Sequence, residues 1–129
     1  MTTGQEVFEL AIQLMNEQSE TSGSACTEDT QTYLFRTPGL LRILCIECVP
    51  ACRDEPRHND VTSLSEPLGL DDDVARGALP YGLAARLLLG ENDVLADFFE
   101  QKFRELLAQL RHRRQVSWEQ LAIDLNGLT

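Results

Sequence analysis

Three cysteines in one short segment are the residues of this sequence best suited to chemistry. Cys45, Cys48 and Cys52 lie at positions i, i+3 and i+7. The CxxC spacing of the first two resembles half of a zinc site, for which His58 is an available fourth ligand. The same spacing places all three on one face of a helix, where free cysteine packs as a small apolar side chain. We therefore interpret the three cysteines as core residues. A zinc site and a thiol redox role remain the alternatives.

The second group that could do chemistry is His58 and the acidic residues around it. Asp54, Glu55 and Asp60 can raise the basicity of this histidine, but no serine or cysteine pairs with it at a recognisable motif spacing. The three aspartates at 71–73 lack the alternating ligands and distal glutamate of a calcium loop, so we interpret them as a helix cap and an acidic first turn. We predict no catalytic residue, no bound metal and no cofactor.

A basic run, Arg111-His112-Arg113-Arg114, stands out in an otherwise acidic chain. Positive charge at the C-terminal end of a helix offsets the helix dipole, which is a purely structural reason for such a run. Contact with DNA or with an acidic partner is the functional alternative.

Composition limits the class of protein. The chain has 129 residues, a formal net charge of −10, 43% hydrophobic residues and 6% aromatic residues. The excess of acid argues against a general nucleic-acid-binding protein, because phosphate contacts need clustered Lys and Arg. The N-terminus shows no secretory leader and no apolar run approaches the ~20 residues of a membrane span, so we expect a cytoplasmic protein with reduced thiols.

The elements that must position these residues are predicted to be helices. Residues 71–114 form an αα-hairpin that is broken near Gly90, which suits a left-handed helix end, and Asn92, which suits the cap of the next helix. Pro80 should bend the first of these helices, over residues 72–89. The second has an apolar stripe at helical spacing, made of Leu95, Phe99, Phe103, Leu106 and Leu110.

Capping residues and breaks predict the elements before the hairpin. A threonine at position 2 or 3 can cap a first helix over residues 3–18, and a polar linker follows at 19–25. A second helical region begins at Thr27. Pro38 divides it, because proline disfavours helical geometry in the residue before it, and the next helix runs over 38–51 with a kinked or frayed last turn.

The rest of the chain is predicted to be irregular. Residues 53–70 form a long loop, with a weakly signalled strand at residues 61–64. Residues 115–129 form a short tail in which Ser117 caps a single turn. The sequence as a whole predicts one all-α domain, residues 1–129, of four or five helices with the hairpin at its centre.

Three segments also carry a family resemblance. GQEVFELAIQLMNE, DTQTYLFRTPGLL and ALPYGLAARLLLGENDVLADFFEQKF occur in this order between residues 4 and 110. Together they resemble small proteins encoded near the capsid genes of tailed bacteriophages and prophages of Gram-positive bacteria. The resemblance implies a helical head–tail connector, or head-completion adaptor, whose subunits form a ring beneath the portal and bridge to the tail. It implies no enzymatic residues.

The functional hypothesis follows from this resemblance. We expect a non-enzymatic adaptor that self-associates and binds portal and tail proteins, first in the host cytoplasm and then at the head–tail junction of the virion. We expect no membrane, no small-molecule substrate, and DNA only as passing cargo. The alternatives are a small cytoplasmic regulatory or protein-binding module, and an enzyme built on the cysteines and His58. The expected interface residues come from the loop, the small-residue helix and the basic run: Arg57, His58, Asp60, Leu64, Gly77, Tyr81, Gly82, Arg111, Arg113 and Arg114.

Overall fold

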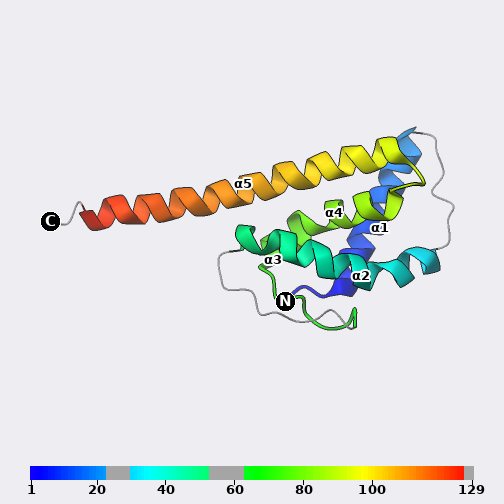
Figure 1. The fold of residues 1–129 in the computed structure, drawn as a ribbon, viewed down its shortest axis with the longest axis horizontal. Helices are drawn as coiled ribbons and strands as arrows, with labels where there is room; N and C mark the ends of the chain where they lie inside the picture. The colour runs from blue at the N-terminus through cyan, green and yellow to red at the C-terminus, as the bar shows by residue number, and fades with distance from the viewer. Residues whose placement is uncertain (23–29, 53–62, 127–129) are drawn as a thin grey trace.

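The protein is a small all-α domain, as predicted. The computed structural model describes residues 1–22, 30–52 and 63–126, with side chains described except at 19–22 and 114–126. Within these ranges the elements follow the order α1 (Gly4–Ser22), α2 (Thr30–Cys48), the 3₁₀ turn η1 (Val49–Ala51), α3 (Asp72–Gly77), α4 (Leu79–Leu88) and α5 (Asp93–Asn126) (Figure 1). Among the described residues, Thr3 and Pro67 form an isolated antiparallel β-bridge.

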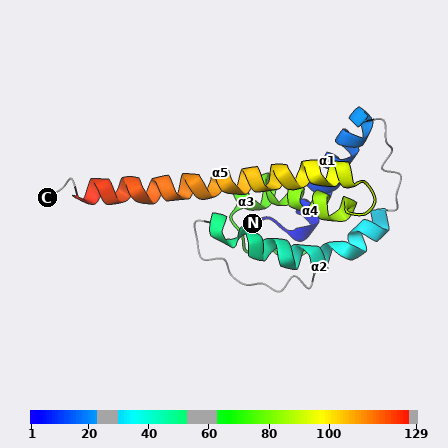
Figure 2. The same cartoon turned by 45° about the horizontal axis from the view of Figure 1, so that its top comes forward.

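Helix α4 lies at the centre of the domain. It packs most extensively against α5 and then against α1 and α2, so that it separates α2 from α5 (Figure 2). Eight of its ten residues are buried, namely Leu79, Pro80, Gly82, Leu83, Ala84, Ala85, Leu87 and Leu88. A helix that is apolar nearly all round is one that other elements enclose, and α4 therefore forms the core onto which the other helices fold.

Helix α1 begins where its cap was predicted and ends later. The Thr3 hydroxyl accepts a hydrogen bond from the backbone N–H of Glu6 at 3.3 Å, which confirms a threonine cap. Val7, Ala11 and Met15 follow at helical spacing and are buried. The helix continues to Ser22, so the first four residues of the predicted linker 19–25 are helical.

Helix α2 runs through Pro38, and the predicted division at that residue is wrong. Proline removes one backbone hydrogen bond and disfavours the helix at a cost of about 3 kcal/mol. Here the same face is buried on both sides of it, with Tyr33 and Thr37 before and Leu41 and Leu44 after. Burial of this continuous face outweighs the proline. The predicted frayed end is confirmed, because the helix passes at Cys48 into η1.

The predicted helix 72–89 is two helices. Helix α3 ends at Gly77, and α4 begins at Leu79 with Pro80 in its first turn. Proline is favoured in a first turn, where its missing N–H would have no partner in the helix. Pro80 therefore starts a helix instead of bending one. The boundary between α4 and α5 is as predicted, because Gly90 has φ +88° and the Asn92 side chain accepts a hydrogen bond from the Leu95 N–H at 3.2 Å.

Helix α5 extends past the predicted end of the hairpin. It runs unbroken from Asp93 to Asn126, so residues 115–126 are not the irregular tail that was expected. The sequence between these residues contains neither glycine nor proline, and the next glycine is Gly127. No glycine or proline therefore stops the helix between the basic run and Gly127. The apolar stripe is confirmed, with Leu95, Phe99 and Phe103 buried. The C-terminal part of α5 reaches beyond the other helices (Figures 1 and 2).

The described part of the predicted loop, residues 63–70, is hydrogen-bonded to the N-terminal residues. The backbone N–H of Gln5 donates to the Leu64 carbonyl at 2.9 Å, and the Leu68 N–H donates to the Thr2 carbonyl at 3.0 Å. Leu64 lies in a turn, and the remainder of the weakly signalled strand lies outside the described residues. The Asp72 carboxylate accepts hydrogen bonds from the hydroxyl and the N–H of Thr2, which hold the pKa of Asp72 below its ordinary value.

Two glycines offer a matched test of this packing. A Cβ atom added at Gly82 would lie 3.0 Å from two ring atoms of Phe103 and 3.1 Å from Leu44, whereas one added at Gly39 would meet nothing within 4 Å. Overpacking costs about 1–3 kcal/mol, and replacing glycine by alanine in an open helix gains up to about 1 kcal/mol. We expect Gly82→Ala to lower the free energy of unfolding in a urea titration and Gly39→Ala to raise it. Equal stability of the two variants would contradict the close approach at Gly82.

Candidate protein-binding surface

The cysteine segment lies against the core. Cys48 and Cys52 are buried and Cys45 is half-buried, as the core interpretation predicted, and none of the three is disulfide-bonded. Burial raises the pKa of Cys45 to about 11 and raises that of Cys48 further. A thiol that holds its proton so firmly is a poor nucleophile. Among the described residues no group of three His, Cys, Asp or Glu side chains could hold a metal ion, and His58 lies outside them.

Thiol reactivity tests this environment. In a Cys26→Ser variant, which confines the readout to these three thiols, Cys48 and Cys52 should resist a disulfide reagent at pH 8 in the native protein. They should react at once in denaturant, because burial and the raised pKa of Cys48 withhold the thiolate until the chain unfolds. Native reaction of all three thiols at the rate of a free cysteine would contradict the buried placement.

The opposite side of α2 carries a second apolar stripe that faces solvent. Phe35 is 88% exposed, Ile43 is 54% exposed and Ile46 is 63% exposed. With Gly39 between them, these residues recur at spacings of three and four and so lie along one side of the helix. We call this set the outer face of α2 (Phe35, Gly39, Ile43 and Ile46). Because exposed apolar patches are common at protein–protein contacts, the outer face of α2 is a candidate binding surface.

Polar contacts along one border of the outer face hold α2 in place. The Arg36 guanidinium donates hydrogen bonds at 3.2 Å to the carbonyl oxygens of Arg86 and Leu87, at the C-terminal end of α4. These carbonyls lack a partner within their own helix, and a cation suits them. The Tyr33 hydroxyl donates to the Glu91 carboxylate at 2.5 Å. The first contact joins α2 to the end of α4 and the second joins it to the turn that follows, and together they fix which side of α2 faces outward.

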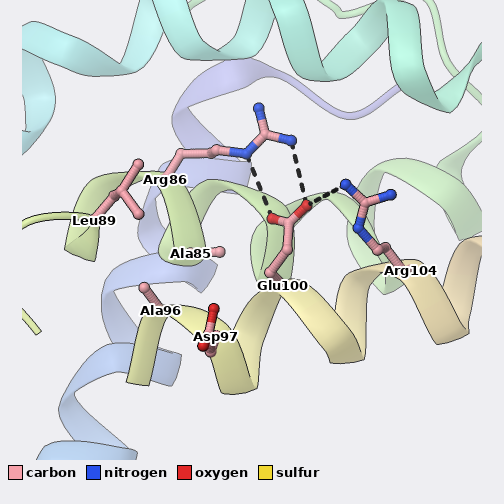
Figure 3. A pocket seen from close by; sticks show the side chains of 7 residues that line it. All are labelled: Ala85, Arg86, Leu89, Ala96, Asp97, Glu100 and Arg104. Carbon is pink, nitrogen blue, oxygen red and sulfur yellow. Dashed lines mark hydrogen bonds and ion pairs between the residues drawn. The ribbon is translucent and has the colours of Figure 1, made fainter. Parts of the chain in front are cut away.

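Arg86 links three helices beside this border. Its Nη2 atom lies 2.9 Å from Glu47 of α2, and its Nε atom lies 3.4 Å from Glu100 of α5. Glu100 also pairs with Arg104 at 3.1 Å (Figure 3). Burial disfavours the charged form of Arg86, but the hydrogen bonds and charges of the two carboxylates outweigh it and raise the pKa of Arg86. Two cations and two carboxylates thus neutralise one another.

A shallow pocket of about 280 Å³ opens between α4 and α5 at this network. Ala85, Arg86, Leu89, Ala96, Asp97, Glu100 and Arg104 line it (Figure 3). Of its charged groups, Arg86 and Glu100 join α4 to α5, and Arg104 pairs with Glu100 within α5.

A further exposed apolar group lies where α4 turns into α5. Leu89 is 65% exposed and Val94 is 84% exposed, and Phe98 follows one turn along α5 with about half of its surface exposed. We call this set the α4–α5 corner (Leu89, Val94 and Phe98). The Phe98 ring packs edge-on against the buried Phe99 ring with centroids 5.5 Å apart, which anchors the corner to the core.

The interface residues expected from sequence are scattered in the structure. Gly77, Arg111 and Arg113 are exposed. Leu64 and Tyr81 are half-buried and pack against the core. Gly82 is buried beneath Phe103 and Leu44, so its small size serves packing within the chain. The others, Arg57, His58, Asp60 and the side chain of Arg114, lie outside the described residues.

Sequence reasoning missed the outer face of α2. The sequence contained a signal for this face, because Phe35, Ile43 and Ile46 lie outside the helical stripe that runs through Leu41 and Leu44. A helix that is apolar on two sides has two faces to cover. The assumed break at Pro38 hid this pattern, since it placed Phe35 and the two isoleucines on different helices.

The Arg86 network gives a matched pair of variants. The Arg86 side chain is 22% exposed and contacts two carboxylates, whereas Arg104 is 69% exposed and contacts one. We expect Arg86→Ala to lower the free energy of unfolding by about 1–2 kcal/mol and Arg104→Ala by no more than about 0.5 kcal/mol, measured by urea titration at pH 7. Equal effects would show that Arg86 does not join the three helices.

The protein is therefore a small all-α domain with exposed apolar faces on two helices, α2 and α5. Among the described residues, no helix has the length and apolar character that crossing a membrane requires. Comparison of the chain with protein-family models, curated proteins and solved structures finds no match.

Proposed function

We propose that this protein is a non-enzymatic structural subunit of a tailed bacteriophage or prophage, a head–tail connector that binds its own copies, the portal and tail proteins. It would assemble in the host cytoplasm and come to lie at the head–tail junction of the virion. The phage context is supported by the resemblance, whose most specific pieces are Arg36-Thr37-Pro38 and Leu79-Pro80-Tyr81-Gly82-Leu83-Ala84. The binding role is supported by the surface.

The observation that carries the proposal is the presence of two separate exposed apolar sets on one small chain. The outer face of α2 and the α4–α5 corner belong to different helices, and each includes a residue more than four-fifths exposed, Phe35 and Val94. Isolated exposed apolar residues are ordinary on a protein surface, but a stripe along a helix favours a partner. Two such sets suit a subunit that contacts more than one neighbour.

Charge and thiol chemistry support the same choice. A net charge of −10 suits a wall past which DNA slides without being held. The exposed basic residues Arg111 and Arg113 give one place for an acidic partner. The raised pKa values of Cys45 and Cys48 favour an adaptor over a thiol enzyme.

Binding to purified phage components tests the proposal. The protein should form a complex with the portal or a tail-completion protein of the same genome, detected by analytical ultracentrifugation. Ile46→Glu or Val94→Glu should weaken that complex by ~10-fold or more, since each places a charge in an apolar contact. Gln109→Glu, at an exposed position outside both sets, is the control. If no phage component binds the intact chain, the connector proposal is wrong and a cytoplasmic regulatory or protein-binding module replaces it.

A further inference from the structure

The outer face of α2 has a feature that packing within the chain does not explain. Gly39 lies in the middle of a 19-residue helix, is exposed, and has no atom within 4 Å of the position its Cβ would take. Glycine within a helix is less favourable than alanine by about 1 kcal/mol. An alanine would fit here without any contact. A close approach by a second backbone, from outside the chain, accounts for the glycine.

The shape of the outer face suits a helix as that second backbone. Phe35 and Ile43 flank Gly39 at i−4 and i+4, so their backbone positions are roughly 12 Å apart along the helix axis. Packed helix axes lie about 8–10 Å apart, and a helix with its side chains is about 10–12 Å across. One helix can therefore cross α2 at Gly39, between the phenylalanine and the isoleucine, with Ile46 beside it.

The chain itself contains a helix of the required kind. Beyond Leu110, α5 continues for sixteen residues to Asn126, and this part reaches past the other helices (Figures 1 and 2). In its sequence Trp118, Leu121 and Leu125 follow one another at spacings of three and four. Apolar residues at this spacing form one stripe along a helix.

The end of α5 and the outer face of α2 cannot meet within one molecule. The buried side of α2 faces α4, which separates it from α5, and the outer face is on the opposite side of α2 (Figure 2). The end of α5 points away from the body of the domain (Figure 1). A contact between the two therefore joins different copies of the chain.

Charge favours this pairing. Helix α2 carries Arg36, Arg42 and Glu47, and so has net positive charge in a chain whose total is −10. The segment after the basic run, residues 116–126, carries Glu119 and Asp124 as its charged residues. Residues 116–126, which carry the apolar stripe, thus have the opposite sign to α2, while the basic run at 111–114 lies before them. This lowers the repulsion between like-charged copies where the stripe meets α2.

We infer that the outer face of α2 is the docking site for the α5 end of a second copy of this chain, with Gly39 at the crossing point. The contact is heterologous, because it joins two different surfaces, and repeated contacts of this kind close into a ring or extend as a filament. The inference rests on the proposed function in that it names the subunit–subunit contact of the proposed ring.

Self-association of the full-length chain tests the inference without any phage partner. Sedimentation is measured over a range of protein concentrations in about 0.5 M salt, where a Debye length of roughly 4 Å screens the repulsion between copies. Ile43→Glu disables the docking site and Leu121→Asp disables the α5 end. Each should weaken self-association by ~10-fold or more, with helical content and melting temperature unchanged, and Gln101→Glu should have no effect.

Mixing the two disabled variants supplies the decisive measurement. Each retains the surface that the other lacks, so an equimolar mixture should form a heterodimer and stop there. A symmetric contact between two α2 faces would leave Leu121→Asp able to self-associate, and that result would overturn the inference. So would a mixture that fails to associate, or a wild-type chain that stays monomeric at the highest concentration. Portal binding without self-association would remove the inference alone, and self-association without portal binding would remove the connector proposal alone.

Discussion

The arrangement of this domain depends on how closely two helices approach α4 at Gly82. With no side chain there, the Phe103 ring of α5 and the Leu44 side chain of α2 both lie within 3.1 Å of the position that a Cβ atom would take. Burial of Phe99 and Phe103 then aligns the first part of α5 along α4. Because α4 is enclosed, every other helix has one side that faces it and one side that faces out. The outward side of α2 includes the exposed residues Phe35, Ile43 and Ile46.

The parts of the fold that sequence could predict are those set by local chemistry. Gly90 and Asn92 mark the boundary between α4 and α5 because a left-handed turn and a side-chain cap need those residue types. The α5 stripe is regular enough to show which residues are buried. Pro38 is the opposite case. Its local preference is to end a helix, but the buried face formed by Tyr33, Leu41 and Leu44 spans it, and burial of that kind depends on neighbours that a sequence does not place.

The candidate surface was harder to predict than the core for a related reason. An apolar residue in a helix predicts burial, and only the positions of the other helices show which apolar residues remain uncovered. Phe35 and Phe103 are both phenylalanines within helices, yet Phe35 faces solvent and Phe103 lies in the core. Arg36 contacts α4, and Arg86 contacts Glu47 and Glu100. These contacts fix the rotation of α2 about its axis and so decide which of its apolar residues face solvent. Nothing in the local sequence around these arginines reveals partners so distant in the chain.

The continuity of α5 gives the molecule a mechanical property. A helix without glycine or proline bends little, so the part after Leu110 moves as one piece with the part that packs on α4. The sixteen residues beyond Leu110 span roughly 24 Å, and a tilt of about 10° at the core would move the far end by about 4 Å. Small adjustments of packing around Phe99 and Phe103 are therefore amplified at the tip of the helix. The packing of α5 in the hydrophobic core therefore sets the position of the far end of the helix.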